Sequence, residues 1–113
     1  VEPINPFRGI HAAVTRQNLQ GEPGPDGWHS EQKLSLTQAL KGFTADPARI
    51  SQREQRLGQI MPGRKADFII LEENPFKLSH SEIHQIKPLA TFIEGFPVFQ
   101  SALLDLDFTQ MRE

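Results

Sequence analysis

Cysteine is absent from this chain of 113 residues, so neither a disulfide framework nor thiolate chemistry is available to it. An excess of positive charge is absent too: the formal net charge is −2, which gives no basic surface for nucleic acid or for an anionic membrane. No apolar run is long enough to span a bilayer. We therefore expect no nucleic-acid partner and no membrane partner, and the lack of cysteine fits a cytoplasmic location.

An initiator methionine and a visible signal peptide are also missing, because the sequence opens on Val1. We expect the natural N-terminus to lie upstream. Hydrophobic residues make up 37% of the chain, which is a low share for a domain that must close its own core. The length still suits one domain with a modest core.

Two helices are predicted in the first half. Asn5 is a good N-cap and Pro6 suits the first helical position, so a helix is expected over about Pro6–Gln17. A loop rich in glycine and proline follows at residues 21–30, and Trp28 is expected to anchor it by burying its ring. Ser35 and Gln38 then have the spacing of a capping box. The apolar face of the second helix is expected to contain Leu36, Ala39, Leu40 and Phe43.

Shorter elements are predicted after the second helix. Asp46-Pro47 favours one more helical turn, with Ala48 and Ile50 facing inward. Strands are expected at Leu57–Ile60 and Ala66–Leu71, with the second buried on both faces. A type II turn at Pro62-Gly63 would join these strands.

The last elements are a short helix and a hairpin. Ser79 and Glu82 suggest a second capping box and a helix that ends before Pro88. Leu89–Glu94 and Phe96–Gln100 are expected to pair around Glu94-Gly95. Pro97 favours an edge position for the second of these strands, because proline cannot donate to a ladder.

Four phrases of the sequence form an ordered pattern over residues 5–98. They are Asn5-Pro6-Phe7-x-Gly9-Ile10-x-Ala12-Ala13-Val14-Thr15-Arg16; Leu34-Ser35-Leu36-x-x-Ala39-Leu40 leading to Phe43-Thr44 and Pro47-Ala48; Gly58-x-Ile60-x-Pro62-Gly63-Arg64-x-Ala66-Asp67-Phe68-Ile69-Ile70-Leu71; and Ile86-Lys87-Pro88-x-x-Thr91-Phe92-Ile93-x-Gly95-x-Pro97-Val98. In this order and spacing they resemble the C-terminal part of the metal-dependent amidohydrolases of family 3. That branch includes the N-substituted formamide deformylase-like and exoenzyme-regulatory-protein-like hydrolases.

The resemblance implies a mixed α/β fold. Residues 1–56 would be terminal helices of a (β/α)₈ amidohydrolase barrel, residues 57–100 would be C-terminal strands of a small β-sandwich (composite) domain, and residues 101–113 would be a tail. The partners of this chain would be the remainder of the barrel and the N-terminal strands of the sandwich. Without them the strands would show an open edge, so we expect the chain by itself to associate with copies of itself.

The resemblance also implies the chemistry. Members of the family hold a divalent metal, here expected to be zinc, and a metal-bound hydroxide attacks an amide-like carbon while an aspartate handles the proton. That aspartate would lie just upstream of Val1, and the His-x-His pair of metal ligands farther upstream. No catalytic residue and no metal ligand of the family therefore maps onto this chain, and alone it is expected to be inactive and metal-free.

The expected function is that of a C-terminal scaffold portion. The intact protein would be a metal-dependent amidohydrolase that cleaves C–N bonds in amide-like, non-peptide substrates. One alternative is a free-standing, non-catalytic binding or assembly module derived from an amidohydrolase. Another is a non-enzymatic paralogue that kept the sandwich and lost the metal.

Histidines were the first candidates for chemistry in the chain itself. His80 and His84 are four residues apart on a predicted helix, as a zinc pair would be, but they lack the His-Glu-x-x-His register. Solvated surface histidines are the better interpretation. His11 is likewise expected on a helix surface, and His29 is expected to pack in a loop beside Trp28.

Four residues of the strand and turn phrases are interpreted as structural. Pro62, Gly63 and Gly95 would shape turns, and Asp67 would fix a turn through hydrogen bonds to Arg64, Lys65 or backbone amides. Arg16 is a candidate for active-site support, because the resemblance places its helix under the catalytic mouth. An ordinary salt bridge at the helix end is the alternative role for Arg16.

Overall fold

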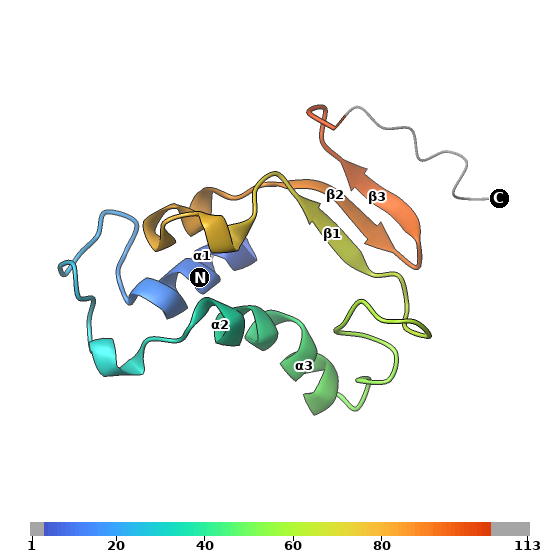
Figure 1. Ribbon diagram of the computed structural model, residues 1–113, viewed down its shortest axis with the longest axis horizontal. Helices are drawn as coiled ribbons and strands as arrows, with labels where there is room; N and C mark the ends of the chain where they lie inside the picture. Colours follow the sequence, from blue (N-terminus) through green and yellow to red (C-terminus); the bar gives the residue numbers. More distant parts are fainter. Residues whose placement is uncertain (1–3, 105–113) are drawn as a thin grey trace. The chain divides into compact units, whose positions relative to one another are not determined.

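The computed structural model describes residues 4–104 and shows two compact units (Figure 1). The first unit comprises residues 4–43 and 73–86, and the second comprises residues 44–72 and 87–104. Each unit thus combines segments that are distant in the sequence. The expected division into barrel helices and sandwich strands stays a prediction, and residues 105–113 of the predicted tail lie outside the described residues.

Helix α1 (Pro6–Thr15) opens the first unit and confirms the first predicted helix. Asn5 caps it, because its side-chain oxygen accepts a hydrogen bond of 3.0 Å from the Phe7 N–H. The helix ends two residues before the predicted end. Arg16 adopts the left-handed conformation (φ 55°), and its N–H donates to the Ala12 carbonyl at 2.8 Å.

Helix α2 (Leu36–Phe43) begins with the predicted capping box. The Gln38 N–H donates to Ser35 Oγ at 3.1 Å, and the Ser35 N–H donates to Gln38 Oε1 at 2.9 Å. Leu36 and Ala39 are buried as expected. The expectation for Phe43 was wrong: it is half exposed, and its ring covers Gly9 of α1 from the edge of the core.

The core of the first unit forms where α1 meets the 3₁₀-helix η3 (His80–Gln85) and α2. Ile83 at the centre of η3 is completely buried. The predicted second capping box was wrong, because the Ser79 side chain makes no cap hydrogen bond and instead lies 3.0 Å from Ser81 Oγ. Two further 3₁₀-helices belong to this unit, η1 (Ser30–Gln32) and η2 (Pro75–Lys77).

Helix α3 (Ala45–Ile50) opens the second unit. It starts before the predicted cap, so Asp46 lies in its first turn and pairs with Arg49 at 2.7 Å. Ala48 is buried as predicted, but Ile50 is 83% exposed and does not face inward.

The predicted strand at Leu57–Ile60 was wrong, because this segment folds back on α3. The Leu57 N–H donates to the Arg53 carbonyl at 2.9 Å, which is a local turn bond. Gly58 has φ +92°, and a Cβ there would lie 2.7 Å from the Cβ of Ala48. The glycine therefore permits a close approach that a regular strand would not provide.

Three antiparallel strands form the sheet of the second unit, in the order β1-β2-β3 (Figure 1). They are β1 (Phe68–Leu71), β2 (Pro88–Ile93) and β3 (Phe96–Gln100). The predicted hairpin is confirmed: Glu94 (φ 51°) and Gly95 (φ 81°) form a two-residue turn with both φ positive, as in type I′. Pro97 lies on an edge strand, as expected.

Within residues 4–104, only one face of the sheet is well covered. Ala90 and Phe92 of β2 are buried, and Phe92 stacks on Phe68 with ring centroids 4.6 Å apart. The expectation that β1 is buried on both faces was wrong, because Ile69 is 46% exposed. Other large apolar side chains of the second unit are exposed too: Ile60, Met61, Ile93, Phe96, Val98, Phe99 and Leu103.

Among the described residues, no helix has both the length and the apolar character that a bilayer crossing requires.

Candidate functional site

A divalent ion, which the resemblance implies, would need a group of metal-ligating side chains. Residues 4–104 contain no group of three or more His, Cys, Asp or Glu side chains that could hold a metal. His80 and His84 do not form a ligand pair, since η3 has three residues per turn and does not place positions i and i+4 on one face. Residues 4–104 therefore do not fit such an ion.

His84 instead contacts His11, and this pair is the main feature that the sequence did not reveal. His11 was expected on the helix surface, but it is only 2% exposed. The two ring centroids are 4.9 Å apart with the planes at 71°, an edge-to-face contact between α1 and η3. Burial, and then the charge of His84, lower the pKa of His11 below its usual value of 6.5.

Arg16 connects the end of α1 to the loop that carries Trp28. Its Nε donates to the Trp28 carbonyl at 2.8 Å, its own carbonyl accepts from the Trp28 N–H at 2.8 Å, and its guanidinium lies 5.1 Å from the centre of the indole ring. With residues 4–104 it forms no salt bridge. Its role in supporting an active site stays a prediction.

Trp28 was expected to bury its ring, but it is 61% exposed. The loop is attached through its backbone and through the Arg16 contact rather than through indole burial. His29 lies beside the same ring, with centroids 4.2 Å apart.

Gly27 makes the attachment of this loop possible, and sequence reasoning missed it. Its φ is +79°, and an added Cβ would collide with the carbonyl oxygen of Thr15. Gly27 is one of several glycines in this loop, so the sequence alone does not show which of them lies against the helix end.

Asp67 holds the hairpin rather than the turn beside it in sequence. Its Oδ1 accepts from the Glu94 N–H at 2.8 Å, and the Gly95 N–H donates to the Ala66 carbonyl at 2.9 Å. Lys65 Nζ adds an ion pair of 2.8 Å to Glu94 Oε1. These contacts join the entry of β1 to the β2–β3 turn and involve exposed groups.

The Pro62-Gly63 turn has type II geometry. Gly63 has φ +85°, and the Arg64 N–H donates to the Met61 carbonyl at 3.1 Å. No atom lies within 4 Å of where a Gly63 Cβ would be. The requirement for glycine there is therefore conformational rather than steric.

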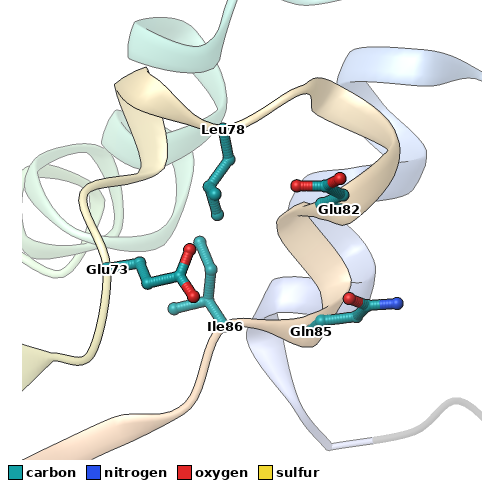
Figure 2. Close-up of a pocket in the computed structure, with 5 residues that line it drawn as sticks. All are labelled: Glu73, Leu78, Glu82, Gln85 and Ile86. Carbon is teal, nitrogen blue, oxygen red and sulfur yellow. The ribbon is translucent and has the colours of Figure 1, made fainter.

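A small pocket of about 60 Å³ lies in the first unit. In Figure 2, Leu78 and Ile86 point toward each other, Glu73 extends toward the same space, and Gln85 extends away from it. Glu82 completes the lining. The residues that line this small pocket offer no nucleophile with an adjacent base.

The chain is similar in sequence to several known proteins. A model described as "Amidohydrolase family" matches residues 1–99. The chain is 30% identical over 102 residues to amidohydrolase YtcJ of Bacillus subtilis (strain 168), and 25% identical over 91 residues to N-substituted formamide deformylase of Arthrobacter pascens. It is 32% identical over 95 residues to Protein LONG AFTER FAR-RED 3 of Arabidopsis thaliana.

These alignments cover most of this chain and little of its relatives. They include 90%, 80% and 84% of the chain, but only 19%, 16% and 16% of the respective relatives. The chain thus spans less than a fifth of the length of the curated relatives that it matches. No solved structure matches the chain.

Proposed function

The chain belongs to the amidohydrolase family, and we propose that it is the C-terminal scaffold portion of a metal-dependent hydrolase that cleaves C–N bonds in amide-like, non-peptide substrates. The observation that carries the proposal is the family match over residues 1–99. The name of one relative, N-substituted formamide deformylase, supports the bond class. On this proposal the metal, expected to be zinc, and its ligands belong to other parts of the intact protein, which we place in the cytoplasm.

The arrangement of the second unit supports a scaffold role. Among the described residues, β1 and β3 are the edge strands of its sheet, and Ile69 on β1 and Val98 on β3 are exposed. Edge strands and exposed apolar side chains are the surfaces to which further strands add. We infer that N-terminal strands of the sandwich and the remainder of the barrel cover these surfaces, and that the chain alone associates with itself instead.

The test is hydrolysis by the intact protein. It is purified, freed of metal with a chelator, and assayed for amine release from an N-substituted formamide, a dipeptide and an ester, with and without added Zn²⁺. We expect zinc-dependent release of amine from the formamide and little from the dipeptide. An intact protein that hydrolyses no C–N bond under any of these conditions would favour the non-catalytic binding or assembly module.

Arg16 offers a test of active-site support. The Arg16→Lys variant keeps the charge but loses the bond from Nε to Trp28. If the loop that carries Trp28 braces the active site, the kcat of the Arg16→Lys variant should fall about tenfold or more, with KM nearly unchanged. The matched control is Arg49→Lys, since Arg49 lies on the surface of α3 and pairs with Asp46. Equal effects of the two substitutions on kcat would leave Arg16 with no role beyond the loop.

A further inference from the structure

The His11–His84 contact has no place in the proposed hydrolysis, yet it lies at the centre of the first unit. His11 is buried on α1. It contacts His84 on η3, which directly follows the fully buried Ile83 in the sequence. The side-chain contact thus lies in the same interface that packs α1 against η3. A change in the protonation of either ring therefore affects the packing of η3 on α1 directly.

One ring nitrogen in this contact is enclosed and unsatisfied. His84 Nδ1 is buried and has no hydrogen-bond partner among the described residues. A neutral imidazole tolerates this, because one of its nitrogens carries no proton. An imidazolium donates from both nitrogens, so protonation would bury an N–H without an acceptor, at a cost in stability. Protonation of both rings would also place two cations about 5 Å apart.

The surrounding charged groups do not relieve that cost. On α1 the nearest charged residue in sequence is Arg8, which is exposed; on η3 they are His80 and Glu82, also exposed; on α2 it is Lys41, exposed as well. Arg16, after α1, is bonded to Trp28. Within residues 4–104 no carboxylate forms a hydrogen bond or an ion pair with His11 or His84.

We propose that the His11–His84 pair is a proton-sensitive contact: with both rings neutral η3 stays packed on α1, and acidification releases η3. The contact would make the first unit responsive to mild acid while the second unit, which lacks a histidine among its described residues, keeps its structure. The device requires only this chain and does not depend on the proposed hydrolysis.

The direction of the pH effect follows from linkage. Burial lowers the pKa of His11, so between its usual value of 6.5 and the lower value in the folded state the open state binds a proton that the closed state does not. The contact is fully stable above about pH 6.5 and weakens as the pH falls through this window. Within this window His11 increases the opening equilibrium up to about tenfold for each pH unit of acidification.

Amide hydrogen exchange of the full chain at pH 7.5 and pH 5.5, corrected for intrinsic exchange, tests the proposal. We expect the amides of α1 and η3 to open about tenfold more at pH 5.5, and those of β2 to show no such change. His11→Gln should flatten this pH dependence, and His84→Gln, which removes the weaker of the two causes, should reduce it. The control His80→Gln, at an exposed position of the same 3₁₀-helix, should leave it as in the unmodified chain.

A second measurement guards against a variant that fails to fold. Nitrogen chemical shifts of the His11 ring in the unmodified chain report its protonation directly, and this ring should stay neutral at pH 6.5, the usual pKa of histidine. Protonation of His11 at its usual pKa of 6.5, or equal pH dependence in the unmodified chain and the His11→Gln variant, would overturn the proposal.

Discussion

The two units of this chain differ in how many of their large apolar side chains are buried. The first places an apolar stripe of one helix against a 3₁₀-helix and a second helix, and thereby buries Phe7, Ile10, Val14, Leu36, Ala39, Ile83 and Ile86. The second buries Ala48, Ala90 and Phe92, while many of its larger apolar residues are exposed. A helix has one stripe to cover, whereas a sheet has two faces and two edges. Three short strands cannot cover them all.

The largest difference between the units should appear on truncation of isoleucine. Ile83→Ala removes a completely buried side chain from the first core and should cost about 2–5 kcal/mol. Ile50→Ala in the second unit, at an 83% exposed position, should change stability by no more than about 0.5 kcal/mol. Urea denaturation measures both. Similar losses for the two variants would abolish the contrast between a closed and an open unit.

Glycine substitution sharpens the comparison within the second unit. Gly58→Ala combines a positive φ with a collision at Ala48, so a loss of about 1–3 kcal/mol is expected. Gly63→Ala has a similar φ but open space, and should cost only the conformational strain of about 1 kcal/mol. Thermal melts of the pair separate the steric part from the conformational part. A cost for Gly63→Ala equal to or above that for Gly58→Ala would contradict the close approach to α3.

The capping box tests local stabilisation in the first unit. Ser35→Ala removes the oxygen that accepts from the Gln38 N–H and should cost about 0.5–2 kcal/mol. The matched control is Thr37→Ala, because Thr37 is an exposed residue in the first turn of the same helix, and this substitution should have little effect on stability. A urea series in which both variants unfold at the midpoint of the unmodified chain would show that α2 does not depend on its cap.

The smallest effect is expected at the hairpin. Lys65→Met breaks the exposed ion pair with Glu94 and should cost about 0.2–1 kcal/mol, less at high salt because exposed pairs are screened. Asp67→Asn is a useful companion, since it weakens the acceptor for the Glu94 N–H. Denaturation at low and high salt distinguishes the two. A Lys65→Met effect that is independent of salt would point to packing of the lysine stem instead.

Sequence reasoning succeeded where structure is local. The Asn5 cap, the Ser35–Gln38 box and the Glu94-Gly95 turn each depend on residues within four positions of one another, so their chemistry can be predicted from spacing. The overall mixture of helix and antiparallel strand, and the family, were predicted as well.

The failures concern contacts between distant segments. His11 was expected on the surface, because no residue near it in the sequence indicates that it contacts His84, 73 positions away on η3. Leu57–Ile60 has the residue types of a strand, but Gly58 packs on α3, and the segment forms local turns instead of a strand. Trp28 is exposed because backbone bonds and Arg16, rather than ring burial, attach its loop.

Sedimentation equilibrium of the 113-residue chain at micromolar concentration, with a thermal melt alongside, tests most directly the claim that the second unit leaves its sheet open for a partner. The account predicts association, and a weaker association for Val98→Lys, which places a charge on the exposed part of edge strand β3, but not for the control Thr37→Lys on α2. A monomer with a sharp, concentration-independent melt would contradict the account and show that the chain closes its own core.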